Sequence, residues 1–426
     1  MRIAASFLFF LLVFSACREK DSVAPDVTIL QPQDGAVFSV FDTVFVTITA
    51  VDETDLASVS ARLVNADFIP IGTSVNVNVN SSTNGGGAEL IIDNKLTDTG
   101  DYYILITAKD GTNEQREFRK IRISGLPKKR RAVYFSSTNG GESDAVSRLD
   151  SLFQNSALWL QADQDIRKIC VNSLNDRLTF IGYLSTGIRS YNIDFLSLSW
   201  SDDIFQAAQT ERYFDLACSE NDVFAAIYDR EVRGYNLSGG LIMNQPTGNY
   251  RPETIFSEGN YLVVEMEFVG DDDHFIFVYQ RQTRVLLWQL DVPMDVISIC
   301  KLQNDEVLLF GNDGGDAKVL HYDIGDNVYW QPRQLPEGRL LGAVSLEGQR
   351  FAIAHENGLY AYTYSPNYLN LIRGGITHQQ LCFDVDKGTI LGASENILEE
   401  VSLNGQLLNT VVHSDSITSI AIHYTR

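Results

Sequence analysis

The stretch 414-SDSITSIAIHYTR-426 decides how most of this chain folds. Its apolar and β-branched residues alternate with polar ones, and an alternation with period two indicates a half-buried β-strand. A strand with an unpaired edge invites aggregation, so it needs a partner elsewhere in the chain. The partner can be found by comparing 417-ITSIAIHY-424 with the rest of the sequence.

An internal repeat fills the sequence from Ala132 onward, and the segment 295–332 (DVISICKLQNDEVLLFGNDGGDAKVLHYDIGDNVYWQP) is its template. One column of equivalent positions lies in the first strand of each repeat and contains Cys170, Cys218, Phe256, Cys300, Val344, Cys382 and Ala421. A second column lies in the third strand and contains Leu149, Tyr191, Tyr235, Tyr279, Tyr322, Tyr362 and Val401. The mean spacing of ~42 residues is typical of the four-stranded blades of a β-propeller.

The two ends of the repeat region complement one another. The segment 130-RRAVYFSST-138 matches second strands such as 178-LTFIGYLS-185, whereas 417–424 matches first strands such as 296-VISICKLQ-303. We therefore expect 417–424 to pair with 132–137, to complete blade one and to close the ring, which removes the exposed edges. The sequence predicts an all-β protein with a seven-bladed β-propeller over residues 132–426, closed by the C-terminal strand.

The cysteine column predicts free thiols. Cys170, Cys218, Cys300 and Cys382 share their column with small or apolar residues, which suits an unreactive thiol packed between blades. We expect equivalent positions on neighbouring first strands to lie beyond the Cα separation of ~7 Å that a disulfide tolerates. A zinc site of four thiolates would need CxxC-type spacing, which the sequence lacks.

Residues 26–125 predict a separate β-sandwich. Alternating strand patterns recur at 27–29, 44–48, 88–93, 101–110 and 116–124, with Gly-containing turns among them. The opening P-x-V-x-I-x-x-P-x-x-G (25–35) and 98-DTGDYYI-104, with Tyr102 at a tyrosine-corner position, resemble bacterial Ig-like domains. Ile104 stands where such domains often carry a cysteine. The resemblance implies a spacer domain, and 124-SGLPKKRR-131 predicts a solvated linker over 126–131.

The first residues resemble a bacterial lipoprotein signal. Arg2, the apolar run 3–14, and the small Ser15 and Ala16 precede Cys17, as in the lipobox of Bacteroidota lipoproteins, although Phe14 departs from the usual aliphatic residue. The resemblance implies removal of the signal before Cys17, lipidation of Cys17, a tether over 18–25 and an outer-membrane lipoprotein facing the periplasm or the cell surface. An ordinary secretory signal is the alternative.

The propeller repeats resemble pyrroloquinoline-quinone-type and WD40-like propellers. The tryptophans 159, 200, 288 and 330 recur in fourth strands, and Tyr-Asn or Tyr-Asp pairs stand at 191, 235 and 322 where WD40 blades carry Trp-Asp. The resemblance does not imply the quinone, because the vicinal cysteine pair of its dehydrogenases is missing. GxSxG, HExxH and Gly-rich phosphate motifs are also missing from the sequence.

Charge and loop composition point to a binding role. The formal net charge of −22 argues against a nucleic-acid ligand, since phosphates need a basic face. The loops joining second to third strands, which should share one face, carry acidic residues in six blades: Glu142, Asp144, Asp229, Glu231, Asp271, Asp272, Asp273, Asp313, Asp316, Glu356 and Glu395. We expect this face to bind a basic protein segment or divalent cations, although turns favour aspartate in any case.

Two further aspartates suggest an alternative, an enzyme. Asp165 and Asp295 share a column at the start of first strands, near the channel mouth, where a metal-dependent lactonase or lyase site could form. The six histidines show no ligand spacing, and 270-GDDDH-274 falls where a polar hairpin is expected. We favour a monomeric binding or scaffolding protein with an envelope protein or glycan as partner. The sequence predicts no cofactor, with Ca²⁺ the one ion such loops could hold.

Overall fold

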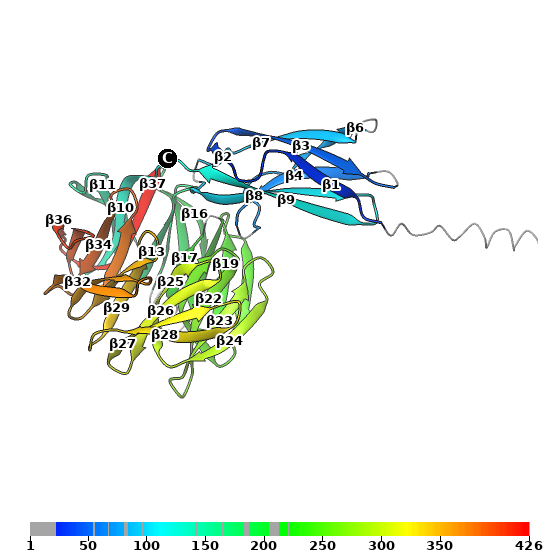
Figure 1. Cartoon of the computed structure of the whole chain (residues 1–426). Coiled ribbons are helices and arrows are strands. Elements are labelled where there is room, and N and C mark those ends of the chain that lie inside the picture. The colour runs from blue at the N-terminus through cyan, green and yellow to red at the C-terminus, as the bar shows by residue number, and fades with distance from the viewer. Residues whose placement is uncertain are drawn as a thin grey trace, which may run out of the picture. The chain divides into compact units, whose positions relative to one another are not determined.

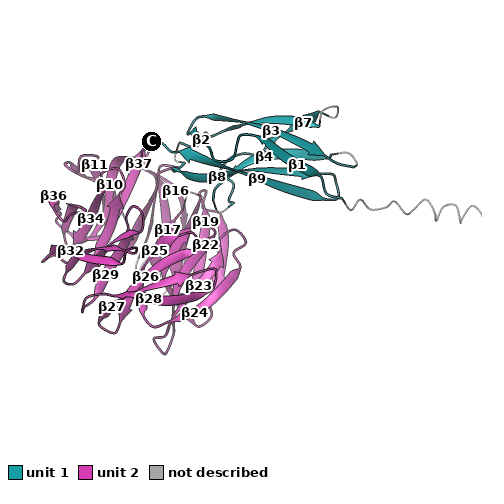
Figure 2. Cartoon of the chain, in the orientation of Figure 1, with its two compact units in different colours: residues 1–126 teal, residues 127–426 magenta. Residues whose placement is uncertain are grey.

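The computed structural model describes residues 23–425 except 54–55, 67, 81–83, 96, 141–143, 163–164, 183–186, 204–212 and 220. The predicted lipid-attachment residue Cys17 lies outside the described residues. The chain divides into two compact units, residues 1–126 and 127–426 (Figure 2). All secondary-structure elements of the described residues are β-strands. In this part of the chain there is no helix with the length and apolar character that crossing a bilayer requires.

Unit 1 is a sandwich of two sheets, with strand orders β1-β3-β7-β6 and β2-β9-β8-β4-β5. The strands are β1 (Asp26–Gln31), β2 (Ala36–Ser39), β3 (Thr43–Val51), β4 (Ser58–Val64), β5 (Val75–Asn76), β6 (Asn78–Asn80), β7 (Gly85–Ile91), β8 (Gly100–Lys109) and β9 (Glu114–Ser124). Alternate residues of these strands, such as Val44, Val46 and Ile48, fill one core between the sheets. The Tyr102 hydroxyl donates to the Asp98 carbonyl at 3.0 Å, which is the contact expected of a tyrosine corner.

Unit 2 consists of seven four-stranded antiparallel sheets within the described residues (Figure 1). Blade one contains β37 (Ser416–Thr425), β10 (Lys129–Thr138), β11 (Ala145–Asp150) and β12 (Ser156–Gln161). Blades two and three contain β13 (Lys168–Asn172), β14 (Arg177–Ile181), β15 (Ile188–Asn192), β16 (Ser197–Asp202), β17 (Tyr213–Cys218), β18 (Asp222–Ile227), β19 (Glu231–Asn236) and β20 (Leu241–Pro246).

The remaining four blades follow the same order along the chain. Blades four and five contain β21 (Tyr250–Glu258), β22 (Tyr261–Phe268), β23 (His274–Gln280), β24 (Leu286–Val292), β25 (Asp295–Gln303), β26 (Glu306–Asp313), β27 (Asp316–Asp323) and β28 (Val328–Gln334). Blades six and seven contain β29 (Leu340–Ser345), β30 (Arg350–His355), β31 (Gly358–Thr363), β32 (Tyr368–Gly374), β33 (Gln380–Asp384), β34 (Thr389–Ser394), β35 (Ile397–Ser402) and β36 (Leu407–Val412).

The inner strands form a closed ring. Each inner strand contacts the next in the order β37, β13, β17, β21, β25, β29 and β33, and β33 returns to β37. The strand β37 pairs antiparallel with β10, with Val133 opposite Ile422 and Phe135 opposite Ile420. The seven-bladed propeller and its closure by the C-terminal strand are thereby confirmed. Apolar clusters between adjacent blades form the core, as where Val278 of blade four meets Val307 and Leu309 of blade five.

The basic run before the propeller is only partly a linker. Strand β10 begins at Lys129, so the predicted linker 126–131 overlaps with blade one. Arg130 is 5% exposed, and one of its terminal nitrogens lies 2.8 Å from Asp384 and 2.6 Å from Glu400 of blade seven. The interpretation of this run as a solvated hinge is therefore wrong for Arg130, which joins the first blade to the last.

The expectation of four free thiols is wrong for two of them. Cys170 and Cys218 form a disulfide between the inner strands of blades two and three, with their Cα atoms 6.2 Å apart. Inner strands of neighbouring blades converge toward the channel, which brings these equivalent positions within disulfide reach. Cys300 and Cys382 are free, and burial raises the pKa of each thiol to about 12.

Candidate functional site

The acidic loop residues predicted from the sequence differ in their surroundings. Asp271, Asp272, Asp273, Asp229, Asp313, Asp316, Glu356 and Glu395 are exposed. Glu231 is half-buried and pairs with Arg233 at 2.8 Å. Asp144 is buried and accepts a hydrogen bond from the Ile166 backbone N–H at 2.6 Å, so it fastens blade one to blade two instead of facing a ligand. Glu142 lies outside the described residues.

A pocket of about 550 Å³ opens between blades four and five and gathers three of these acids, Asp272, Asp273 and Asp313. Its lining comes from the β22–β23 loop, the connection from β24 to β25, the β26–β27 loop and the residues that precede blade six. The carboxylates in this lining belong to Asp272, Asp273, Asp291, Asp295 and Asp313. Among the described lining residues, Arg339 carries the permanent positive charge. The pocket is therefore a strongly acidic cavity with one cation at its side.

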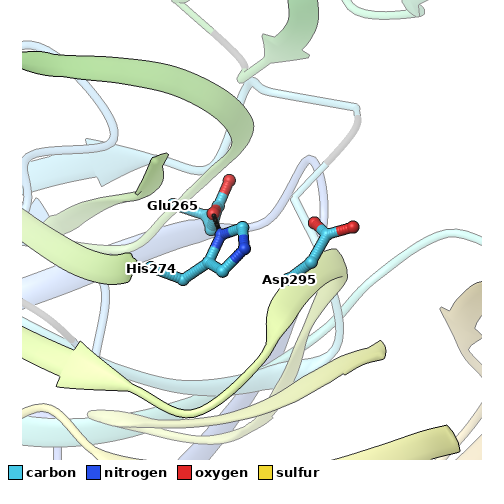
Figure 3. A group of neighbouring side chains, drawn as sticks. All are labelled: Glu265, His274 and Asp295. Carbon is cyan, nitrogen blue, oxygen red and sulfur yellow. Dashed lines mark hydrogen bonds and ion pairs between the residues drawn. The ribbon is translucent and has the colours of Figure 1, made fainter. Parts of the chain in front are cut away.

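His274, which lines this pocket together with Asp295, lies between two carboxylates (Figure 3). His274 begins β23 and Asp295 begins β25, while Glu265 lies on β22, the strand that pairs with β23. The His274 Nδ1 atom lies 2.7 Å from Glu265 Oε1, and its other ring nitrogen is directed toward Asp295 (Figure 3). One potential ligand atom from each of the three residues lies within 4.8 Å of the other two.

Burial and neighbouring charge perturb every group of this cluster. Glu265 has no exposed side-chain surface, and burial raises its pKa to about 8. Burial also raises the pKa of Asp295 and of the neighbouring Glu253. For His274, burial lowers the pKa, but the hydrogen bond to Glu265 and the surrounding carboxylates outweigh this and raise it. Ionisable groups perturbed in this way, and gathered in a cavity, mark candidate functional sites.

Glu253 belongs to the edge of the same cluster. It lies at a bulge in β21, where the pairing with β22 is interrupted between Pro252 and Ile255. Arg251 donates to Glu253 at 2.9 Å and also contacts Glu267. Arg251 thus neutralises these two glutamates, whereas His274 pairs with Glu265 and the charges of His274 and Arg339 act on Asp295.

Two of these residues were missed by the sequence interpretation. The hairpin 270–274 was expected to be a solvated turn, which holds for the three aspartates but not for His274. Glu265 was not singled out, although the repeat contains a signal for it. The strand pairings put Glu265 in a column that other blades fill with Ser136, Ile181, Ala226, Phe310, Ala354 and Ala393. A carboxylate at a buried position that other blades fill with small or apolar residues destabilises the fold unless it is paired or has a function.

The two predicted channel-mouth aspartates lie in different neighbourhoods. Asp295 faces His274 at the junction of blades four and five. Asp165 precedes the inner strand of blade two, and its charge contributes to raising the pKa of the buried Asp144. The structure therefore places them at equivalent positions of separate blades and not in one shared site.

Comparison with known proteins supports the fold and nothing finer. No protein-family model matches the sequence, and no curated protein is similar to it in sequence. A crystal structure of a Lactobacillus plantarum protein matches 70% of this chain and all of its own, with a TM-score of 0.53 at 14% identity. Raptor from Chaetomium thermophilum matches 61% of this chain and 26% of its own, with a TM-score of 0.51 at 11% identity. A quinoprotein alcohol dehydrogenase-like protein from Bacteroides thetaiotaomicron covers 93% of this chain and 99% of its own at a TM-score of 0.47 and 11% identity.

Proposed function

We propose that the protein is a cell-envelope lipoprotein whose propeller binds a basic segment of another envelope protein through the acidic pocket. In this proposal Cys17 carries the lipid and the N-terminal sandwich is an Ig-like spacer. One observation carries the binding role: five aspartates from three separate segments converge on one pocket that holds a single arginine. Like charges repel, so a concave surface that collects them gains most from a cationic occupant.

The binding role can be tested with a matched pair of variants. The pocket variant changes Asp272, Asp273, Asp291 and Asp313 to Asn. The control variant neutralises four exposed acids that do not line the pocket, Asp229, Asp316, Glu356 and Glu395, and therefore removes the same charge. Binding of a fluorescent hexa-arginine peptide to the full mature chain should be weakened at least tenfold by the pocket variant and much less by the control. Equal weakening by both variants would show that net charge alone causes the effect, and it would refute the pocket as the binding site.

The envelope location has its own test. Cys17→Ser should move the protein from the membrane fraction to the soluble fraction, because lipidation at Cys17 is the anchor that we propose. Unchanged membrane association of the Cys17→Ser protein would contradict the lipoprotein assignment without affecting the pocket.

The pocket also favours a second candidate function, a metal-dependent lactonase or lyase. The observation behind it is that Asp295 lies beside His274, so a general base or a metal ligand is available in an open cavity. Hydrolysis of a panel of lactones by the metal-loaded protein, lost in Asp295→Asn, would support this function. Absence of turnover across the panel would leave binding as the role of the pocket.

A further inference from the structure

Glu265 is the unusual group in this part of the molecule. Its side chain is completely buried, and its Oε1 atom is paired with His274. The Oε2 atom, however, is buried without a hydrogen-bond partner among the described residues. An unsatisfied buried carboxylate oxygen costs stability unless something else binds it or neutralises it. Among the described residues, Glu265 is therefore committed to His274 alone.

The orientation of His274 indicates what the cluster can bind. With Nδ1–H donating to Glu265, the other ring nitrogen, Nε2, keeps its lone pair and is directed toward Asp295 and the pocket (Figure 3). A carboxylate that holds the far nitrogen of an imidazole is the usual support of a metal-binding histidine. One candidate ligand atom of each residue lies within 4.8 Å of the other two, whereas two ligands at ~2.1 Å from one ion lie at most ~4.2 Å apart, so small side-chain movements would bring them onto one ion.

We propose that Glu265, His274 and Asp295 form a binding site for one divalent transition-metal ion, with zinc as the preferred ion. His274 and Asp295 bind the ion, and Glu265 positions the imidazole and supplies compensating negative charge from the side of the ring away from Asp295. The imidazole favours zinc over calcium, which takes oxygen ligands. Because the cluster faces an open pocket, the remaining coordination positions are available to water or to a ligand. This site does not depend on the proposed binding of a basic segment.

A second histidine–glutamate pair in the propeller shows the difference between a packing pair and this site. In blade seven, His378 Nε2 lies 3.1 Å from Glu399 Oε2, and Arg373 donates to Glu399 Oε1, also at 3.1 Å. Both oxygens of Glu399 are thus satisfied, and His378 is 1% exposed and packs against Gly392. Glu265 has one free oxygen and its histidine faces a cavity. The pair in blade seven is therefore a matched internal control.

Zinc binding to the full mature chain tests the proposal directly. Competition with a chromophoric chelator should give one Zn²⁺ per chain for the wild type. We expect at least a tenfold loss of affinity in His274→Gln and in Asp295→Asn, and a ten- to hundredfold loss in Glu265→Gln, the range for residues that support a metal-bound histidine. The control His378→Gln should bind zinc as the wild type does. Cobalt substitution and X-ray absorption should report nitrogen and oxygen ligands without sulfur.

Two results would overturn the site: less than one zinc per chain, or equal affinity in the wild type and His274→Gln. Thermal melts without metal check that each variant folds. If His274→Gln does not fold, the zinc affinity of Asp295→Asn provides the test, because Asp295 is only half-buried and its replacement should be tolerated. The peptide assay is repeated with EDTA to separate this inference from the proposed function. If the peptide still binds in EDTA and the chain does not bind zinc, the metal site is refuted and the proposed peptide binding is not.

Discussion

Single residues at the blade junctions connect neighbouring blades through buried polar networks. Arg130 illustrates this: it is buried against Asp384 and Glu400, and its Nε atom also donates to the Ser151 carbonyl at 3.1 Å. Glu400 in turn accepts hydrogen bonds from Thr389 and Asn409. A buried charge in such a network contributes little to the free energy of unfolding when it is paired. Its removal, however, leaves its partners buried without a counter-charge.

We predict that Arg130→Met lowers the free energy of unfolding by about 3–5 kcal/mol, since it leaves two buried carboxylates without their cation. Arg131→Ala is the matched control. Arg131 pairs with Asp194 at 2.6 Å, but its side chain is 39% exposed, and a pair in that setting contributes less than about 1 kcal/mol. Urea unfolding at pH 7 measures both, and similar losses in the two variants would contradict the assignment of Arg130 as a buried junction residue.

A second residue-scale prediction concerns mild acid. His378 faces Glu399 and Arg373, and His423 faces Asp176, Arg131 and Asp194; burial lowers the pKa of both imidazoles below 6.5. At these two imidazoles the unfolded chain therefore takes up protons in a range of pH where the folded chain does not, so both lower the stability as the pH drops below about 6.5. Above that pH these two imidazoles cause no loss of stability, because neither chain protonates them there. Glu265 and His274 act in the opposite direction, because their raised pKa values favour the folded state in acid.

The measurement is the free energy of unfolding in urea between pH 7.5 and 5. His378→Gln cannot take up this proton in either state, so its decline with falling pH should be shallower than that of the wild type. Identical declines in the two proteins would mean that His378 does not contribute to the acid sensitivity.

Individual residues also show why the candidate site was harder to predict than the fold. Asp295 was singled out from its column, whereas His274 was assigned to a solvated hairpin. His274 and Asp295 are distant in the sequence and meet only because the β22–β23 loop and the start of β25 share one face of adjacent blades. Comparison of equivalent positions in the second strands would have identified Glu265. Its hydrogen bond to His274 and its unpaired oxygen depend on side-chain packing, which the sequence repeat does not determine.

At the scale of elements, the inner strands explain one error. The cysteine column was assigned correctly to the inner strands, but the distance between neighbouring strands was overestimated. Equivalent residues of β13 and β17 are close enough to be cross-linked, with their Cα atoms 6.2 Å apart. The sequence repeat fixes which residues are equivalent, whereas the spacing between blades follows from the volume of the side chains that pack between them.

The cross-link leads to a chemical prediction. In a chain that begins at residue 23, unfolding without a reductant should allow alkylation of Cys300 and Cys382 but not of Cys170 and Cys218, and mass spectrometry of the peptides will show this. Reduction should lower the free energy of unfolding by about 2–4 kcal/mol, because a closed loop of this length restricts the unfolded chain. Four alkylated cysteines without a reductant would contradict the disulfide.

At the scale of the whole molecule, the repeat predicts the architecture because each blade contains the same strand pattern and only one arrangement completes all seven blades. We predict that deleting 416–425 leaves β10 with an unpaired edge and breaks the ring between blades seven and two, which leads to aggregation and to the loss of a single cooperative unfolding transition. Calorimetry and light scattering will measure both effects.

A rearranged chain provides the control for this deletion. Residues 416–425 are removed from the end and inserted before Lys129 through a short Gly-Ser turn, which is compatible with the pairing of Thr425 with Lys129. This chain should regain one cooperative transition. An unaltered melting curve after simple deletion would show that the ring does not need its last strand.

The entry of the chain into blade one has a mechanical consequence. The sandwich is connected to the propeller through β10, which is paired on one side with β11 and on the other with β37. A tension applied through the N-terminal unit would therefore be carried by two hydrogen-bond ladders at once, and the strand could not be peeled away as an outermost strand could. Arg130, near the first residue of that strand, would take up the load next to its two carboxylates in blade seven. A propeller joined in this way should resist mechanical unfolding when it is pulled from its N-terminal side.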